Sequence, residues 1–378
     1  MNSAYRAGLA LALGLLLGLL AALSFVPASA LGQGPQRTYS YVEIGVFGTA
    51  SADGRGTGAA WDVNSAEQVV GASTTNVFGA GRAFRWDAGR LDNLGVIGGG
   101  TFAASAAYGI NDAGDVVGQS HVNATDPPHA VLHRNGVLTD LGTGFGSGSF
   151  SRAWEINDVG EIVGERSRRQ SSPVRAFLLR NGRFRDLGTL GGVGGSFGTS
   201  SVAYGINARR QIVGAAQPPS GPLHAFLWER GAMRDLGTLG GDDEATEARD
   251  LNDAAQVVGS SPTTAGLTHA FLWESGAMRD LGTLGGNSSH AYGINVDGDV
   301  VGGSRTANSP ANNAGHAFLW AKGRMVDLNA VVTNLPGNVA LEVAQAINDD
   351  GSIVGTTCTG FCEPGKTAPT RAFLLVPN

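Results

Sequence analysis

One pattern recurs seven times along this chain of 378 residues and constrains its fold more than any other feature. Each copy reads Ala-x-x-aliphatic-Asn and is followed, at a constant offset, by an aliphatic residue, Val and Gly. The copies end at Asn64, Asn111, Asn157, Asn207, Asn252, Asn295 and Asn348. Their spacing of 43 to 53 residues indicates an array of similar structural units.

Two further segments recur in the units. The third segment starts with His or Arg, as in HAFLW at 269–273, and leads into a fourth, MRDLG at 278–282. In the first six units a Gly lies seven residues after that His or Arg, and an Asp or Asn lies eleven residues after it. This fixed spacing is typical of a tight β-hairpin, because Gly adopts the positive φ that such turns need. Each unit is therefore predicted to hold four short strands, which read AYGIN, VVG, HAFLW and MRDLG.

The apolar runs in these strands predict how the units pack. They do not alternate with polar residues, which is expected of strands that are covered on both faces. A single four-stranded sheet cannot cover both of its own faces, so neighbouring units must pack against it. Such sheets arranged around an axis make an all-β, seven-bladed β-propeller.

The two ends of the repeat region predict how the ring closes. The last unit stops after its third strand, RAFLLVPN, and lacks a fourth. A spare fourth strand, YVEIGVFG at Tyr41–Gly48, lies before the first unit. Pairing this N-terminal strand with the last blade would give seven four-stranded blades and leave no exposed sheet edge at the junction. Glu43 would then take the position that Asp280 holds in the fifth unit.

The sequence motifs of the repeats also resemble those of a known family. HAFLW…G.M.DLGTLGG and AYGIN..G.VVG are similar to the HAF-repeat family of extracellular bacterial proteins, over residues 41–376. The resemblance implies an exported β-repeat protein. It implies no catalytic residues and no ligand, so no site residue is transferred from it.

The N-terminal segment is predicted to be an export signal. Residues 1–30 hold an early Arg, an apolar run and small residues before a cleavage point after Ala30. An uncleaved membrane anchor is the alternative. Residues 31–40 then form a short linker and residues 41–378 a single domain, in which no segment is apolar enough to span a membrane. The mature protein is expected to be secreted, periplasmic or extracellular.

The two cysteines, Cys358 and Cys362, lie close together in CTGFC. In an oxidising compartment they are predicted to form a local disulfide. Zinc binding is the alternative, although neither a second cysteine pair nor a nearby His completes a tetrahedral site.

The charge balance excludes some classes of partner. The chain has 26 Lys and Arg against 32 Asp and Glu, a formal net charge of −6. This composition predicts no nucleic-acid partner and argues against a phosphate-binding role. No nucleophile motif, cofactor fingerprint or metal triad stands out, so no cofactor is predicted.

A His or Arg and an acidic or amide residue recur together in the hairpins. If the loop holds two residues, Glu274 and Ser275, then His269 lies directly opposite Asp280. A three-residue loop would turn the two side chains to opposite faces. Catalysis needs one site, so many copies predict a structural network rather than catalytic couples. The seven pairs are Arg82 and Asn93, His129 and Asp140, Arg175 and Asp186, His224 and Asp235, His269 and Asp280, His316 and Asp327, and Arg371 with Glu43 across the closure.

The first strand of each unit is expected to line the central channel. The residue two positions before its Asn is acidic in units one, three and five. These residues, Asp62, Glu155 and Asp250, are candidate ligands for calcium or a sugar. Three solvated carboxylates in a wet channel are the alternative.

Other recurring features have structural and functional interpretations. The NDAGD turns resemble parts of calcium loops but lack the final Glu, so plain turns are predicted. Four Trp that end the third strands are predicted to pack between blades rather than to stack on sugars. They are Trp86, Trp228, Trp273 and Trp320.

Loop lengths differ only on one predicted face of the disc, where recognition usually resides. An acidic loop there brings together Asp242, Asp243, Glu244 and Glu247. A pair of these carboxylates could provide acid and base for glycoside hydrolysis, and a simply solvated run is the alternative.

We therefore expect an exported, monomeric β-propeller that acts as a non-catalytic binding or surface-interaction scaffold. Its ligand, an unknown protein or glycan, is expected on the variable-loop face. The alternative function is a secreted carbohydrate-active enzyme that uses carboxylates on that face or in the channel.

Overall fold

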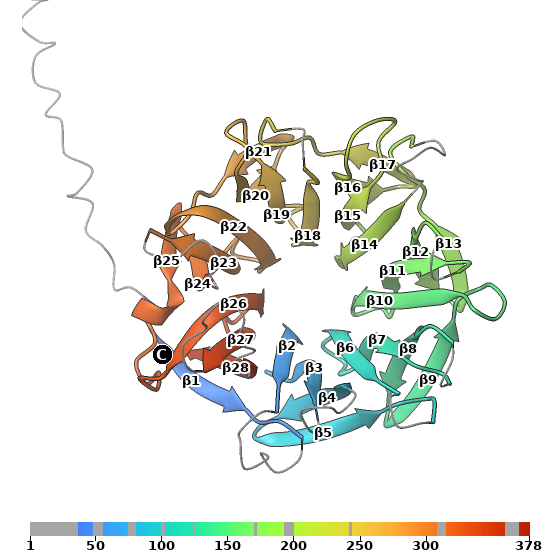
Figure 1. Ribbon diagram of the computed structural model, residues 1–378, viewed down its shortest axis with the longest axis horizontal. Helices are drawn as coiled ribbons and strands as arrows, with labels where there is room; N and C mark the ends of the chain where they lie inside the picture. The colour runs from blue at the N-terminus through green and yellow to red at the C-terminus, as the bar shows by residue number, and fades with distance from the viewer. Residues whose placement is uncertain are drawn as a thin grey trace, which may run out of the picture. The chain divides into compact units, whose positions relative to one another are not determined.

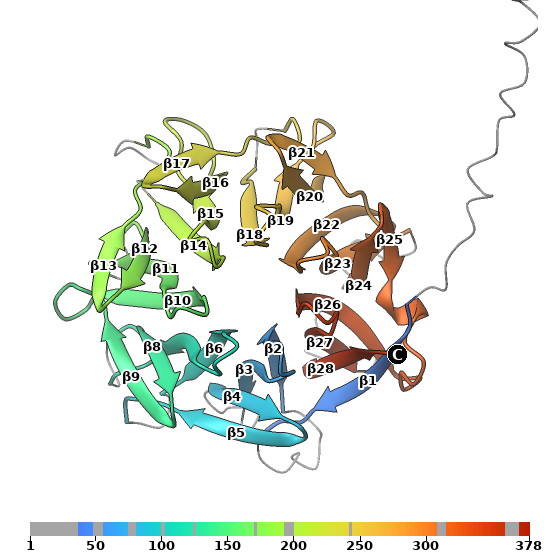
Figure 2. The ribbon, with the colours of Figure 1, turned by 180° about the vertical axis from the view of Figure 1, so that it is seen from behind.

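The computed structural model describes residues 37–47, 56–74, 81–99, 103–123, 126–169, 172–192, 200–241, 244–307, 315–359 and 370–378. Within these ranges, seven four-stranded antiparallel sheets stand like blades around a central channel (Figure 1). Figure 2 shows the same ring from behind. The all-β, seven-bladed propeller predicted from the repeats is confirmed. No described helix is long and apolar enough to cross a membrane.

The strands of each blade follow one another from the channel outward. The innermost strands are β2 (Gly58–Val63), β6 (Ser105–Ile110), β10 (Phe150–Ile156), β14 (Ser201–Ile206), β18 (Glu247–Leu251), β22 (Gly285–Ile294) and β26 (Val339–Ile347). The second strands are β3 (Val69–Thr74), β7 (Val116–Ser120), β11 (Ile162–Ser167), β15 (Ile212–Ala216), β19 (Val257–Pro262), β23 (Val300–Thr306) and β27 (Ile353–Thr359). The third strands are β4 (Gly81–Asp87), β8 (His129–Arg134), β12 (Arg175–Arg180), β16 (His224–Glu229), β20 (Thr268–Glu274), β24 (His316–Ala321) and β28 (Thr370–Pro377). The outer strands are β5 (Arg90–Gly95), β9 (Val137–Gly142), β13 (Arg183–Asp186), β17 (Ala232–Asp235), β21 (Ala277–Asp280), β25 (Arg324–Asp327) and β1 (Tyr39–Ile44). A short 3-10 helix, η2 (Leu328–Ala330), follows β25.

The ring closes through the N-terminal strand, as predicted. Strand β1 pairs antiparallel with β28, and Glu43 stands opposite Phe373. This is the same register position that Asp280 holds opposite Phe271 in the fifth blade. The strand starts at Tyr39, two residues earlier than expected, because Tyr39 and the next residue also pair with the end of β28.

A close backbone contact explains the Gly that ends every aliphatic-Val-Gly triplet. A Cβ added to Gly71 would lie 1.9 Å from the carbonyl oxygen of Ala59 and 2.7 Å from the Phe84 ring. In each of the seven blades the nearest carbonyl would lie 1.9 to 2.0 Å from such a Cβ, so no side chain fits. Phe84 faces this Gly and is fully buried, and a Phe occupies the same place in six of the blades.

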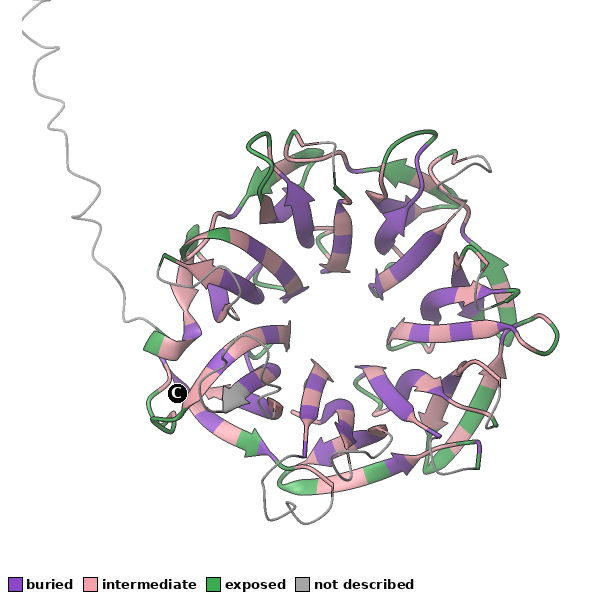
Figure 3. Ribbon diagram, viewed as in Figure 1, coloured by how far each residue is buried: buried purple, intermediate pink, exposed green. Residues whose placement is uncertain are grey.

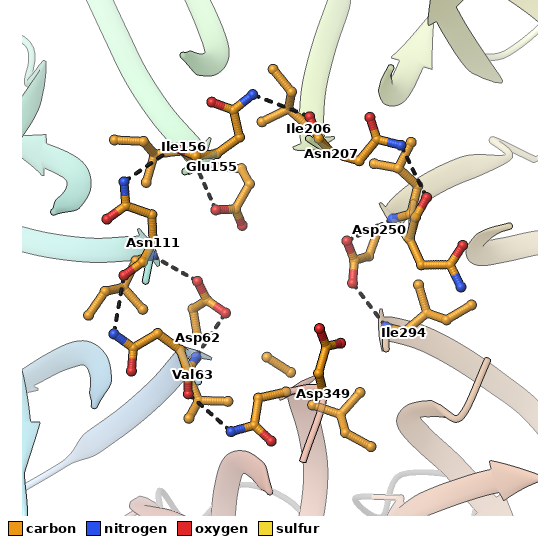
Figure 4. A pocket seen from close by; sticks show the side chains of 18 of the residues that line it. Asp62, Val63, Asn111, Glu155, Ile156, Ile206, Asn207, Asp250, Ile294 and Asp349 are labelled. Carbon is orange, nitrogen blue, oxygen red and sulfur yellow. Dashed lines mark hydrogen bonds between the residues drawn. The ribbon is translucent and has the colours of Figure 1, made fainter. Parts of the chain in front are cut away.

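The repeated Asn side chains connect the blades to one another. The Nδ2 of Asn64 donates to the carbonyl of Asn111 at 3.1 Å, and each later Asn repeats this contact with the next blade. Asn348 donates to the carbonyl of Asn64 at 3.0 Å and completes a ring of seven (Figure 4). Each Asn Oδ1 also accepts from the backbone N–H four residues later, so the side chain holds its own turn as well.

The hydrophobic core lies between the blades. In one cluster, Leu178 of the third blade packs with Phe226 and Trp228 of the fourth. The guanidinium of Arg185 in the third blade lies 4.9 Å from the centre of the Trp228 ring, and the next two blade pairs repeat this contact. The four Trp at the ends of the third strands are 3 to 9% exposed. Their predicted role in blade packing is confirmed, and Figure 3 shows the buried residues concentrated in the inner strands.

The ring of asparagines makes a testable prediction about stability. Asn295→Ala would leave the N–H of Asp299 and the carbonyl of Asn348 without their side-chain partner. Because Asn295 is 2% exposed, we expect the free energy of unfolding to fall by about 2 to 4 kcal/mol, from two lost buried contacts. Chemical denaturation measures this loss. The control is Asn181→Gly, in an exposed turn at φ 50°, which should leave stability unchanged within about 0.5 kcal/mol. Equal stability of both variants would contradict the role of the ring.

Candidate functional site

Each innermost strand contains a β-bulge at the same position. The register between β2 and β3 shifts at Trp61, which is an extra residue in β2, and the other six innermost strands shift at the equivalent residue. The extra residue always lies three positions before the repeated Asn. Around the ring these residues are Trp61, Tyr108, Trp154, Tyr204, Arg249, Tyr292 and Gln345. A bulge changes the direction of the side chains, and this one turns a residue of each blade toward the channel.

These seven bulge residues and Glu155 line a small cavity of about 110 Å³ in the channel. The Tyr108 ring lies 4.9 Å from Trp61 and 4.6 Å from Trp154, measured between ring centres. Arg249 stacks on the Tyr204 ring at 4.3 Å. The cavity therefore combines flat aromatic faces with a guanidinium, an amide and a carboxylate, groups that can both stack and donate or accept hydrogen bonds.

A wider part of the same channel, about 320 Å³, is strongly acidic. Seven carboxylates line it: Asp62, Asp112, Glu155, Asp158, Asp250, Asp253 and Asp349. Arg249 is the only basic residue among the described residues of this lining. Figure 4 shows Asp62, Glu155, Asp250 and Asp349 around the opening. The structure thus brings the three channel carboxylates predicted from the sequence into one cavity.

The three predicted channel carboxylates have backbone partners. Asp62 Oδ1 accepts from the N–H of Val63, and Oδ2 accepts from Ile110 in the next blade, both at 2.8 Å. Asp250 makes the equivalent two contacts, the second with Ile294 at 2.9 Å. Glu155 accepts from the N–H of Ile156 at 2.8 Å. Asp62 and Asp250 therefore join neighbouring blades, a structural role that sequence spacing did not reveal.

Gly in the neighbouring blade makes room for these carboxylates. A Cβ on Gly109 would lie 2.9 Å from Glu155 Oε1 and 2.9 Å from the carbonyl of Trp154. At this pair of blades, the alternation of Gly and an acidic residue therefore has a steric cause.

Four other carboxylates form a separate set at the turn end of the channel. They follow the repeated Asn directly, and each Oδ1 accepts from the N–H of the equivalent residue in the preceding blade. These residues are Asp112, Asp158, Asp253 and Asp349. The turns that carry them are plain β-turns, as predicted, with the N–H three residues after each Asn bonded to the Asn carbonyl.

Burial shifts the pKa values of the channel carboxylates upward. Burial raises the pKa of Asp62 to about 7, although its two backbone N–H donors lower the pKa and the charge of Asp250 raises it further. Burial also raises the pKa of Asp250 to about 6, against the same kind of backbone contacts. The pKa of Glu155 rises well above its usual range through burial and then through the charge of Asp62.

The channel carboxylates do not form a metal centre. Among the described residues, no three His, Cys, Asp or Glu side chains are grouped in a way that could hold a metal ion. The calcium hypothesis therefore has no support from this geometry.

The His and Asp of the hairpins lie within hydrogen-bond distance, in a different register from the one expected. His269 Nδ1 lies 2.9 Å from Asp280 Oδ2. The loop is Ser275 and Gly276, not Glu274 and Ser275, because Ser275 and Gly276 hold the positive φ angles of 52° and 90°. Phe271 therefore stands opposite Asp280, and His269 reaches it diagonally on the same face.

The other His pairs form the same contact at 2.7 to 3.0 Å: His129 with Asp140, His224 with Asp235, and His316 with Asp327. A hydrogen bond to Asp327 raises the pKa of His316. Arg371 Nε lies 3.7 Å from Glu43 across the closure. The Asp side chains are 28 to 43% exposed, so the pairs are partly exposed surface contacts that add little to stability.

Other residues predicted from the sequence lie away from the channel cavities or outside the described chain. Glu244 accepts from the Thr268 hydroxyl at 2.9 Å on the surface, and Glu247 pairs with Arg249. Asp242, Asp243, Cys362 and the side chain of Cys358 lie outside the described residues, as do residues 1–36. The predicted acidic pair, disulfide and export signal therefore stay predictions.

The bulge aromatics are the part of the site that sequence reasoning missed. The signal was present: the position three before each Asn reads Trp, Tyr, Trp, Tyr, Arg, Tyr and Gln around the ring. A regular strand alternates its faces, so only one of two successive residues was expected in the channel.

The fold defines the molecule as a seven-bladed β-propeller whose central channel is lined by aromatic and acidic side chains. Comparison with known proteins shows the same fold and no family. No model of a known protein family matches the chain, and no curated protein matches its sequence. The structure is similar to that of a puromycin-hydrolyzing peptidase from Mycobacterium tuberculosis, with a TM-score of 0.54 and 13% identity over 88% of this chain and 54% of that one.

It is also similar to a prolyl endopeptidase structure, with a TM-score of 0.51 and 15% identity over 83% of this chain and 48% of that one. TolB from Acinetobacter baumannii matches with a TM-score of 0.47 and 12% identity over 78% of this chain and 66% of that one. The chain spans about half the length of the two peptidases. At these identities the likeness shows the fold alone.

The raised pKa values predict how stability depends on pH. Asp62 and Asp250 have folded-state pKa values of about 7 and 6 against 3.8 when unperturbed. Between about pH 4 and pH 7 the folded chain therefore binds more protons than the unfolded chain, and its stability falls as pH rises. We expect up to about 4 kcal/mol less unfolding free energy at pH 8 than at pH 5 from these groups.

Denaturation at several pH values measures this effect, and Asp250→Asn should make the slope shallower. Asp297→Asn, at an exposed position of a neighbouring turn, is the control and should leave the slope unchanged. A parent slope that matches that of Asp250→Asn would show that the channel carboxylates do not titrate in this window.

Proposed function

We propose that this protein is a non-catalytic, glycan-binding propeller whose ligand enters the central channel from the variable-loop face. One observation carries the proposal: every blade contributes its bulge residue to a single cavity, and five of these seven residues are Trp or Tyr. Aromatic faces stack on the apolar faces of sugar rings, while the guanidinium, amide and carboxylate groups beside them can bond sugar hydroxyls.

The direction of the innermost strands supports entry from the variable-loop face. Each innermost strand runs toward its Asn turn, so the bulge residue lies on the side of the carboxylates that is away from the turns. The loops of variable length that lead into these strands emerge at that same end. A ligand that enters there meets the aromatic cavity before it meets the acidic part of the channel.

The bulge also assigns ligand binding and fold stability to different residues. The extra residue takes no part in the strand ladder, so its identity is free to differ between blades, whereas the Gly opposite the bulge cannot change. Trp61 and Gln345 illustrate this freedom at equivalent positions. A site built on rigid strands with variable side chains suits recognition.

A secreted carbohydrate-active enzyme is the second candidate, because one observation favours it. The pKa of Asp62, raised to about 7, is that of a group that could exchange a proton near neutral pH, and burial also raises the pKa of Glu155. Against catalysis, both oxygens of Asp62 already accept backbone N–H groups of two blades. A general acid or base of a glycosidase must instead reach the scissile oxygen or a water molecule.

We also propose that the protein is exported. Two features of the sequence support this proposal. One is the apolar N-terminal run with small residues before position 31, and the other is the similarity of the repeats to the HAF-repeat motifs. Mass spectrometry of the protein from culture supernatant would test it, with Leu31 expected as the first residue.

A glycan array tests the proposed function. We expect the purified protein to bind a defined set of glycans, and Trp61→Ala and Tyr292→Ala each to weaken the affinity for the best of them at least about tenfold, or 1.4 kcal/mol. Tyr292→Phe keeps the ring and should retain most of the affinity. Val137→Ala, at an exposed site on the outer strand β9, is the control.

Binding without release of reducing sugar would support the scaffold over the enzyme. Release that is lost in Glu155→Gln would establish the enzyme instead. If no glycan binds, or if Trp61→Ala binds like the parent, the proposal is wrong.

A further inference from the structure

Six arginines line one groove between the third and fourth blades. The groove has a volume of about 450 Å³ and is also lined by Leu178, Trp228 and Gly231. The arginines are Arg180, Arg183, Arg185, Arg209, Arg210 and Arg230. They come from strands β12 and β13, from the turn between β14 and β15, and from the turn between β16 and β17. This places close to a quarter of the 26 basic residues of an acidic chain in one cavity.

Part of this positive charge is balanced within the protein. The buried carboxylate of Glu161 lies 3.0 Å from Arg180 Nε and 2.7 Å from Arg210 Nη2. Burial tends to raise the pKa of Glu161, but hydrogen bonds from Arg210 and Asn157 and the two arginine charges lower it overall. Glu161 therefore stays ionised and binds two of the guanidinium groups that line the groove.

The remaining arginines have few partners. Arg185 stacks on the Trp228 ring. In the described part of the chain, the guanidinium groups of Arg183, Arg209 and Arg230 form no hydrogen bond or ion pair. Glu161 thus contacts two of the six guanidinium groups, and no Asp or Glu is among the described residues that line the groove, which leaves a formal charge of about +5 there.

The repeat itself does not require these arginines. At the equivalent positions one blade further along, between the fourth and fifth blades, five of the six are replaced by other residues. Glu229, Ala232, Ala254, Ala255 and Ser275 stand there, and only Arg234 keeps the basic character, at the position of Arg185. The two grooves share their backbone and their Trp, so the arginines are an addition specific to one groove.

One of these arginines also occupies an unfavourable backbone position. Arg210 has a φ of 60°, in the left-handed region that favours Gly. Gly occupies the same turn position in four other blades: Gly114, Gly160, Gly298 and Gly351. Arg210 therefore pairs with Glu161 from a backbone conformation that costs about 1 kcal/mol for a residue with a Cβ.

We infer that this groove binds a compact, polyvalent oxyanion, a small molecule that carries two or more phosphate groups. The guanidinium fork matches the oxygens of a phosphate, and each phosphate carries a charge of about −1.5 to −2 at pH 7. Two linked phosphates would balance most of the charge that the groove leaves over. The cavity volume is also in the range that holds small molecules.

The charge of the rest of the protein favours a compact anion over a long one. The chain has a net charge of −6, so without the six arginines the remainder carries −12. A nucleic acid or an acidic polysaccharide would extend beyond the groove onto this negative surface and be repelled. The average composition argued against phosphate binding, and our inference departs from that expectation for this single groove.

Titration calorimetry with inorganic pyrophosphate tests the inference. We expect saturable binding to the full-length protein at 150 mM salt. We also expect an affinity at least about tenfold lower in the combined variant Arg183→Ala, Arg209→Ala and Arg230→Ser. These replacements are the residues that the neighbouring groove uses, so the fold should tolerate them, which thermal unfolding will verify.

Two controls separate site binding from general attraction. Arg324→Ala removes an exposed arginine at the repeat position of Arg183 in another blade, and its affinity should stay within about twofold of the parent. Citrate offers comparable charge on carboxylates and should bind at least about tenfold more weakly than pyrophosphate.

Absence of pyrophosphate binding, equal affinity of the folded triple variant, or equal binding of citrate would each overturn the inference. If a long polyphosphate binds far more tightly per molecule than pyrophosphate, the compact ligand class is wrong.

Discussion

The ring of seven asparagine side chains is the interaction on which the rest of the structure depends. Each Asn uses its Oδ1 to hold its own turn and its Nδ2 to hold the backbone of the next blade. Only a short amide can do both, because Asp lacks the donor and Gln reaches too far. The ring sets how closely the innermost strands approach one another. It therefore sets the width of the channel and the positions of the side chains that line it.

The bulge in each innermost strand connects this scaffold to the candidate site. The carbonyl of the residue two positions before the bulge residue approaches the second strand so closely that only Gly fits there, which explains a feature common to all seven units. The same bulge removes one residue from the strand ladder and turns it toward the channel. The Gly of the second strand, which cannot be replaced, thus lies close to the bulge residue, which can vary. The bulge residue is Trp, Tyr, Arg or Gln, depending on the blade.

Much of the fold could be predicted from the sequence, but less of the site. The repeats predicted the length of each unit and its four strands. The missing fourth strand of the last unit predicted that β1 closes the ring. The hairpin register stayed open in the sequence, and the pairing of His269 opposite Asp280 was wrong by two residues, because the turn is Ser275 and Gly276, both at positive φ. The aromatic cavity was missed because a bulge breaks the two-residue alternation of a strand, and the pattern AYGIN does not reveal an extra residue. Asp62 and Asp250 were placed correctly in the channel, but their bonds across blades need the neighbouring strand to be known.

By itself the sequence determined the number of blades, the order of their strands and the way the ring closes. These properties follow from local patterns that repeat, and each repeat adds independent information about the same unit. Only the tertiary structure decided most of the charge distribution. The repeat spacing placed three carboxylates in the channel, but seven meet there, and six arginines separated by up to 50 residues in the chain meet in one groove. Electrostatic interactions depend on distance in space and are screened within about 8 to 10 Å, so net charge cannot predict such clusters.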